Sequence, residues 1–151
     1  FKQKTAYEML RSLVGSEMCI RDRVGEIAQV PPAFSAVKIG GVSSYRLAKS
    51  GKQPVSAART VRIDRLEVLE YAWPVLRLEI RCGRGTYIRA VARDLGERLG
   101  CGACCETLIR RAVGPWRMEE AVHLDRASPE AVRSALIPLE SARALLAGYV
   151  G

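Results

Sequence analysis

The sequence has 151 residues, a length that one domain accounts for. Its hydrophobic fraction of 48% and charged fraction of 26% are typical of a folded globular protein and exclude an intrinsically disordered chain. The 24 lysine and arginine residues outnumber the 16 aspartate and glutamate residues, and the net charge of +8 favours a polyanionic partner.

The first 23 residues differ in character from the rest. Their apolar residues follow neither a helical period nor strand alternation, and no turn or cap leads into residue 24. The tract, which ends in SLVGSEMCIRDR at residues 12–23, resembles translated sequencing-adaptor sequence. We therefore expect residues 1–23 to be a non-native leader. They hold five basic and three acidic side chains, so the remaining chain still carries +6.

A coherent pattern of elements begins at residue 24. Pro31-Pro32 forces an extended backbone, and the next apolar run predicts a short strand over residues 34–39. Ser43 or Ser44 is placed to cap a short helix over residues 45–49.

The middle of the chain predicts two strands and the strongest helix. Residues 61–69 read as a strand, and residues 76–82 alternate apolar and charged side chains with the period of a half-buried strand. After a glycine-rich turn, apolar residues recur on one face of a predicted helix over residues 88–99, which Gly100 ends. This stripe consists of Ile88, Val91, Ala92, Leu95 and Leu99.

The last third predicts shorter elements. A strand is expected over residues 107–113, broken by Gly114-Pro115. Ser128-Pro129 is a cap followed by proline at the first helical position, which opens a helix through about residue 136. A further helix begins after Pro138, so the chain from residue 24 reads as one α+β unit.

Residues 82–89 carry the most informative motif. Gly83 and Gly85 let the backbone approach a ligand closely, and Thr86 is placed to cap the helix. Tyr87 and Arg89 then emerge at the helix start, where a guanidinium can form a bidentate pair with a carboxylate or phosphate. The alternative is a tight strand-to-helix turn with a solvated arginine.

A second motif occupies residues 29–51. Lys38 and Lys49 are candidates for phosphate contacts, and Tyr45 for stacking or packing. Taken one at a time, these residues fit structural roles better, because Pro31-Pro32 rigidifies a turn and Tyr45 can fill the edge of a core.

The cysteine pattern argues against a zinc protein and a secreted disulfide-rich protein, and the apolar runs argue against a membrane protein. Cys101 and Cys104 form a Cys-x-x-Cys pair, but neither a second pair nor a nearby histidine completes a zinc site, and His123 reads as a surface residue. Five unevenly spaced cysteines do not form a secreted disulfide framework. No apolar run approaches the roughly 20 residues that cross a bilayer. We expect a cytoplasmic protein without a metal or a membrane segment.

In order and spacing, the two motifs resemble the tRNA pseudouridine-55 synthase (TruB-type) family from residue 24 to about residue 124. The matching positions are Gln29, Pro31-Pro32, Ser35-Ala36, Lys38, Gly41, Tyr45, Gly51, Arg59, Val61, Ile63, residues 85–89, residues 94–96, Leu99-Gly100, Gly102-Ala103, Leu108, Arg110 and Gly114-Pro115. Any one matching motif is weak, but six motifs in register are specific. The guide-RNA pseudouridine synthases of archaea and eukaryotes share some of this pattern and are the alternative family.

The resemblance implies a fold and a reaction. The fold would be α+β, with a mixed, largely antiparallel sheet and flanking helices. Residues 24–124 would be part of a catalytic domain, and residues 125–151 the helical start of a C-terminal region. The intact enzyme would isomerise uridine to pseudouridine at position 55 in the TΨC stem-loop of tRNA. It would act as a monomer, with the target base flipped into the site and with no metal or organic cofactor.

The resemblance also assigns roles to residues. Arg89 would pair with a catalytic aspartate and Tyr87 would line the uracil pocket, while Leu108 would pack against the base. Further substrate contacts would come from Lys38, Tyr45, Gly85 and Thr86.

One departure from the family is serious. The aspartate belongs to a Gly-x-Leu-Asp block that this sequence lacks, and the possible substitutes Asp64 and Asp94 are expected to be solvated or paired locally. The chain alone is therefore predicted to be inactive. The alternative function is a non-catalytic RNA-binding module that uses a basic surface formed by Arg59, Arg62, Arg84, Arg93, Arg110 and Arg111.

Overall fold

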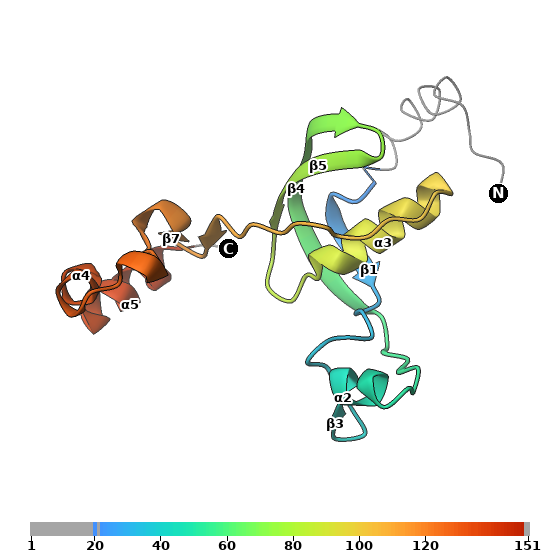
Figure 1. Cartoon of the computed structure of the whole chain (residues 1–151), viewed down its shortest axis with the longest axis horizontal. Helices are drawn as coiled ribbons and strands as arrows, with labels where there is room; N and C mark the ends of the chain where they lie inside the picture. The colour runs from blue at the N-terminus through green and yellow to red at the C-terminus, as the bar shows by residue number, and fades with distance from the viewer. Residues whose placement is uncertain (1–19, 21, 150–151) are drawn as a thin grey trace. The chain divides into compact units, whose positions relative to one another are not determined.

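The computed structural model describes residue 20 and residues 22–149 (Figure 1). The chain forms two compact units, one ending at Glu106 and the other beginning at Thr107. The functional boundaries predicted at residues 23 and 124 stay a prediction. Within the described ranges, no helix is long and apolar enough to cross a membrane.

An antiparallel sheet of three strands is the framework of the first unit. Its order is β1 (Gly25–Gln29), β4 (Arg59–Ala72) and β5 (Val75–Cys82). Ile63 of β4 pairs with Gly25 on one side and with Cys82 on the other. The alternation that predicted β5 is confirmed to within one residue, whereas β4 is longer than the strand expected at residues 61–69.

The core of the first unit lies between this sheet and α3 (Ile88–Leu99), which crosses one face of the sheet (Figure 1). Ile63 and Leu66 of β4 are buried against Val91 and Leu95 of α3. The predicted apolar stripe is confirmed, and Gly100 ends the helix with a left-handed φ of 70°. The α+β fold with an antiparallel sheet and a flanking helix is therefore confirmed.

Three residues of the predicted leader belong to the described structure, and the others lie outside it. Ile20 is buried in the same core cluster, and Arg23 is buried with its guanidinium 3.5 Å from a carboxylate oxygen of Asp94. The non-native origin of residues 1–23 stays a prediction.

A small hairpin and helix follow β1. Strands β2 (Lys38–Ile39) and β3 (Val42–Ser43) pair around two glycines of positive φ and lead into α2 (Ser44–Lys49). Of the two candidate caps, Ser43 accepts the hydrogen bond from the Arg46 backbone N–H.

The strand predicted over residues 34–39 is wrong except for its last two residues. The backbone bends at residues 33–36, where the Ser35 N–H donates to the Ala33 carbonyl. The same carbonyl also accepts a 2.5 Å hydrogen bond from the buried Ser44 hydroxyl. These local bonds compete with an extended backbone, as serine side chains often do.

The second unit consists of short elements. They are β6 (Ala112–Val113), β7 (Trp116–Arg117), the 3-10 helices η1 (Met118–Glu120) and η2 (Leu124–Arg126), α4 (Pro129–Ala135) and α5 (Leu139–Gly148). The strand expected over residues 107–113 is confined to β6, because its partner β7 has only two residues. Ser128 caps α4 and Pro129 occupies its first turn, as predicted.

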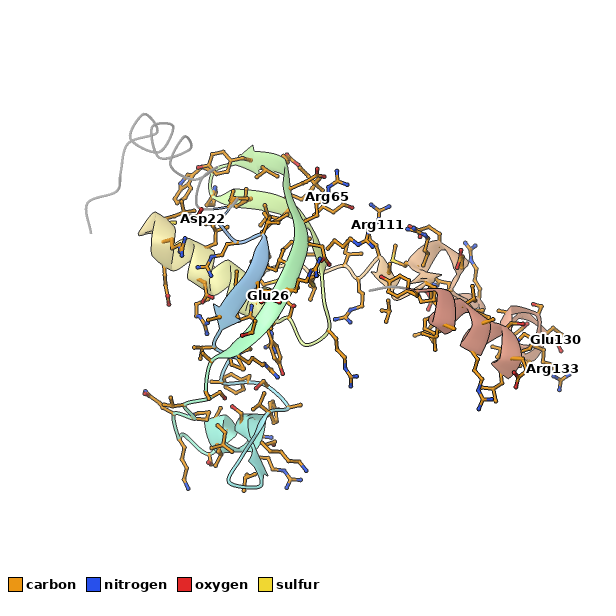
Figure 2. The ribbon with its side chains drawn as sticks, turned by 180° about the vertical axis from the view of Figure 1, so that it is seen from behind. Asp22, Glu26, Arg65, Arg111, Glu130 and Arg133 are labelled. Atoms are coloured by element: carbon orange, nitrogen blue, oxygen red, sulfur yellow. The ribbon has the colours of Figure 1, made fainter. Side chains whose placement is uncertain are left out.

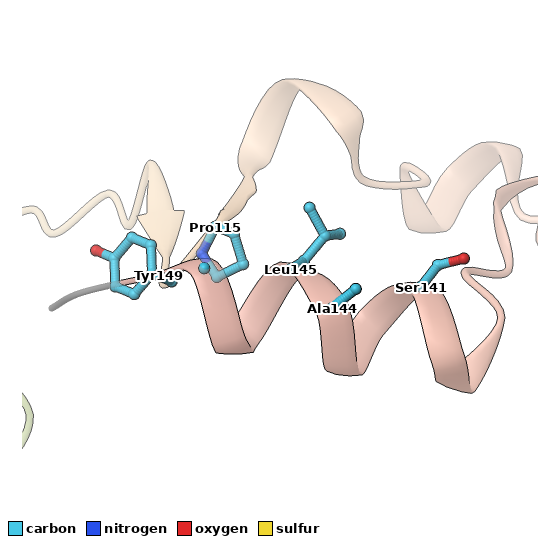
Figure 3. Close-up of a pocket in the computed structure, with 6 residues that line it drawn as sticks. Pro115, Ser141, Ala144, Leu145 and Tyr149 are labelled. Atoms are coloured by element: carbon cyan, nitrogen blue, oxygen red, sulfur yellow. The ribbon is translucent and has the colours of Figure 1, made fainter.

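One carboxyl group and one groove stand out in this unit. The pKa of Glu119 lies below its usual range because its own backbone N–H hydrogen-bonds to the carboxylate, with further stabilisation from Arg111. A shallow groove runs between the turn at Pro115 and α5, where Leu145 and Tyr149 line it (Figure 3).

Candidate functional site

The bend between β5 and α3 brings the first predicted motif to the start of a helix. The Gly83 N–H donates to the Arg62 carbonyl at 2.8 Å, which ties the bend to β4. Gly85 has a φ of 85°, a conformation that glycine adopts without a steric penalty. The predicted capping role of Thr86 is wrong, because its hydroxyl donates back to the Gly83 carbonyl at 3.0 Å and Tyr87 is the N-cap residue.

Gln29 fixes the backbone of Tyr87. Its Oε1 accepts the Tyr87 N–H at 2.9 Å, and its Nε2 donates to the Tyr87 carbonyl at 3.2 Å. The Gln29 side chain is fully buried, at 0% exposure. In the sequence, Gln29 belongs to a motif but has no assigned role, because its hydrogen bonds to Tyr87 join residues 58 positions apart.

Arg59 lies over the ring of Tyr87. The guanidinium carbon is 5.0 Å from the ring centroid, a cation–π contact. The buried Nε and Nη2 of this guanidinium have no hydrogen-bond partner among the described residues. The half-buried Tyr87 thus has its backbone held by β1 and one face of its ring covered by a side chain from β4.

Arg89 connects the two predicted motifs. Its side chain is exposed, and Nη2 donates to the Phe34 carbonyl at 2.8 Å. Across the described part of the chain, no carboxylate lies within ion-pair distance of Arg89. Because a guanidinium carries five N–H donors, the remaining donors are available to another acceptor.

Phe34 also contacts Tyr45, the aromatic residue of the second motif. The two ring centroids are 6.0 Å apart in an edge-to-face arrangement, and the side chains are 52% and 50% exposed. Lys38 lies on the neighbouring strand β2 and is exposed. The structure therefore links Arg89, Phe34 and Tyr45, and Lys38 lies on the hairpin between Phe34 and Tyr45 in the chain.

Leu108 lies in the second unit and is 55% exposed, so its contact with a base stays a prediction. The predicted substrate contacts of Gly85 and Thr86 likewise stay predictions.

Both possible substitutes for the expected aspartate are paired with arginine. Asp94 bonds to Arg93 at 2.6 Å and also pairs with Arg23, and Asp64 bonds to Arg62 at 2.7 Å. Local pairing was expected for Asp94, whereas Asp64 was expected to be solvated. Arg111 (Figure 2) pairs with Glu119 at 3.5 Å, so several members of the predicted basic surface are charge-compensated.

The described ranges hold no group of three or more His, Cys, Asp or Glu side chains placed to bind a metal ion. Cys101 and Cys104 are exposed free thiols.

A family comparison matches this region. Residues 5–88 match the model of the TruB family pseudouridylate synthase (N terminal domain). This range includes β1, β4, β5 and Tyr87, and it begins within the residues predicted as a leader.

Individual relatives extend the comparison. The tRNA pseudouridine synthase B of Dehalococcoides mccartyi (strain ATCC BAA-2266 / KCTC 15142 / 195) is 48% identical over 103 residues, which cover 68% of this chain and 34% of the relative. The same-named protein of Clostridium tetani (strain Massachusetts / E88) is 35% identical over 141 residues, covering 93% and 48%. This chain thus spans about a third to a half of the length of these relatives.

A solved structure is also similar. The crystal structure of a Cbf5-Nop10-Gar1 complex contains a chain that aligns with a TM-score of 0.63 at 27% identity. The alignment covers 85% of this chain and 38% of the solved one.

Proposed function

Because the chain belongs to the TruB family of pseudouridylate synthases, we propose that it is part of a tRNA pseudouridine synthase acting on uridine 55 of the TΨC loop. The observation that carries this proposal is the placement of Tyr87 and Arg89 at the start of α3, where Gln29 fixes the Tyr87 backbone. The names of the relatives support tRNA as the substrate. We further propose that the protein acts as a cytoplasmic monomer.

The proposed reaction exchanges one bond for another. With the uridine flipped out of the stack, an aspartate acts on the nucleotide and the bond between the sugar and N1 breaks. The uracil turns and C5 bonds to the sugar. C5 then loses its proton, and N1, which has left the sugar, gains one. Tyr87 would line the pocket in which the uracil turns, and Leu108 would pack against the base.

Arg89 would position the aspartate. In the structure this side chain is already oriented by its bond to the Phe34 carbonyl. A carboxylate bound to the remaining guanidinium donors would be held ionised and correctly placed. Our expectation that this chain alone is inactive follows, because the sequence lacks the block that carries the aspartate.

A pseudouridine assay tests this proposal. Incubated with unmodified tRNA, the chain alone should form no pseudouridine. A chimera that joins the N-terminal part of the D. mccartyi relative to residues 24–151 should form it. Product from the chain alone would refute the predicted inactivity, and a folded but inactive chimera would contradict the proposed enzyme.

A second candidate function is RNA binding without catalysis. The exposed Phe34–Tyr45 pair and Lys38 on the adjacent hairpin favour it, because aromatic rings and cations together suit single-stranded RNA. We propose a TΨC stem-loop as the partner in both cases.

The salt dependence of binding tests this surface. Lys38→Ala should weaken stem-loop binding and lower the slope of log affinity against log salt by about 1, because one phosphate contact is lost. Arg77→Ala is the matched control, since Arg77 is exposed but pairs with Glu70 at 3.0 Å. An unchanged slope in Lys38→Ala would show that Lys38 does not contact an RNA phosphate.

A further inference from the structure

We infer that Gln29 is the positioning residue that holds Tyr87 for the uracil, and that Arg59 sets the orientation of the Tyr87 ring. This inference rests on the proposed function. It assigns roles to two residues that neither the motifs nor the resemblance assigned.

The hydrogen bonds of Gln29 give the first line of support. One buried side-chain amide bonds to both backbone polar groups of Tyr87, at 2.9 Å to the N–H and 3.2 Å to the carbonyl. The same carbonyl also accepts the N–H groups of Ala90 and Val91, which begin the helix. Tyr87 is the N-cap residue of α3, and no side chain caps the helix from that position. Gln29 therefore ties the N-cap residue of α3 to the end of β1.

The position of Gln29 in the sheet gives the second line of support. It is the last residue of β1, just before Pro31-Pro32, and it pairs in register with Arg59 of β4. Directly opposed residues of an antiparallel pair project to the same face of a sheet. Both side chains thus reach Tyr87 from one site on the sheet, Gln29 at the backbone and Arg59 at the ring.

The environment of Arg59 gives the third line of support. Its buried Nε and Nη2 have no hydrogen-bond partner in the described ranges, and its guanidinium carbon lies 5.0 Å from the centroid of the Tyr87 ring. With Arg59 over one face of the ring, we place the base at the opposite face or at the ring edge. Arg89 follows two residues later on the same helix, so the backbone that Gln29 fixes also carries the Arg89 guanidinium.

The test compares binding of two RNAs to the full chain. One is a TΨC stem-loop with uridine at position 55, and the other is the same stem-loop with an abasic site there. A base contact of ordinary strength should make the chain bind the uridine RNA about tenfold more tightly. All other contacts are common to the two RNAs, so the ratio of their Kd values reports the base site alone.

The variants separate positioning from stability. Gln29→Met keeps the volume but loses both hydrogen bonds, and its Kd ratio should fall to about 1. Gln29→Glu keeps an acceptor for the Tyr87 N–H and should retain an intermediate ratio. Leu66→Ala is the control, because it opens a cavity in the same sheet without removing a contact to Tyr87, and its ratio should stay at about ten. Hydrogen exchange at the Tyr87 amide should accelerate in Gln29→Met relative to the other sheet amides.

The outcomes are distinct. A wild-type ratio near 1 contradicts the proposed uracil site and this inference with it. A wild-type ratio of about ten that persists in Gln29→Met overturns the inference alone, as does an equal loss of the ratio in Leu66→Ala. If Gln29→Met does not fold, Arg59→Met decides instead, because loss of the cation over the ring should also lower the ratio. An unchanged ratio in Arg59→Met would then overturn the inference.

Discussion

At the scale of single residues, the bend before α3 depends on one backbone conformation. Gly83 and Gly85 both border Arg84, but only Gly85 has a positive φ. A Cβ at Gly83 would make ordinary contacts at 3.6 Å and 3.7 Å with Arg62, whereas one at Gly85 would have open space but a strained backbone. Substitutions at the two glycines therefore distinguish the cost of a strained backbone, at Gly85, from the cost of added side-chain contacts, at Gly83.

We predict that Gly85→Ala lowers the free energy of unfolding by about 1 kcal/mol, because alanine must adopt the left-handed region. Gly83→Ala should change it by less than about 0.5 kcal/mol. Urea denaturation of the two variants measures the difference. Equal losses would show that φ at residue 85 is not what constrains the bend.

Residue patterns predicted the position of the site better than its contacts. The glycine-rich turn placed Tyr87 and Arg89 at the start of a helix, and the structure confirms this placement. The hydrogen bonds of Gln29 were not predicted, because a buried amide can bond to any backbone group that folding brings near it. Nothing in the local sequence around residue 29 identifies a partner at residue 87.

At the scale of elements, α3 carries the core on one side and a close backbone contact at its end. Gly96 faces residues 102 and 103, and a Cβ there would lie 2.2 Å from the Ala103 nitrogen and 2.3 Å from the Gly102 carbonyl carbon. The Gly102 N–H also donates to the Gly96 carbonyl at 3.0 Å. The loop after α3 thus packs directly on the helix backbone.

We predict that Gly96→Ala destabilises the chain by about 2–3 kcal/mol, since neither backbone atom can move aside cheaply. This loss should exceed the gain of up to about 1 kcal/mol that alanine normally brings within a helix. Glu97→Ala at the neighbouring exposed position should change stability by less than about 0.5 kcal/mol. Thermal unfolding compares the two, and a Gly96→Ala variant as stable as the parent would disprove the close packing.

Elements with a strong period were predictable, and elements without one were not. The alternation of β5 and the apolar stripe of α3 fixed their position because each buries one face against the other. The segment at residues 34–37 has strand-like composition, but serine hydrogen bonds around Ala33 bend it. Of the strand predicted at residues 107–113, only two residues form a strand, because the partner strand β7 has only two residues.

At the scale of the whole molecule, the chain supplies a sheet, a helix and a candidate uracil site, but only about a third to a half of the length of its relatives. Two separate motifs converge in the first unit, where Arg89 reaches Phe34 and Phe34 contacts Tyr45. This convergence favours a site over a simple turn with a solvated arginine. We expect the carboxylate that would complete the site to belong to the Gly-x-Leu-Asp block, which this sequence lacks.

Pseudouridine formation at position 55 of unmodified tRNA, by the chimera with and without an intact Arg89, tests the account most directly. We predict that Arg89→Ala and Arg89→Lys each reduce the rate by about 100-fold or more, because neither side chain can hold a carboxylate in bidentate geometry. Arg77→Ala should leave the rate unchanged. A chimera that remains fully active with alanine at residue 89 would contradict the role of this arginine and the site built around it.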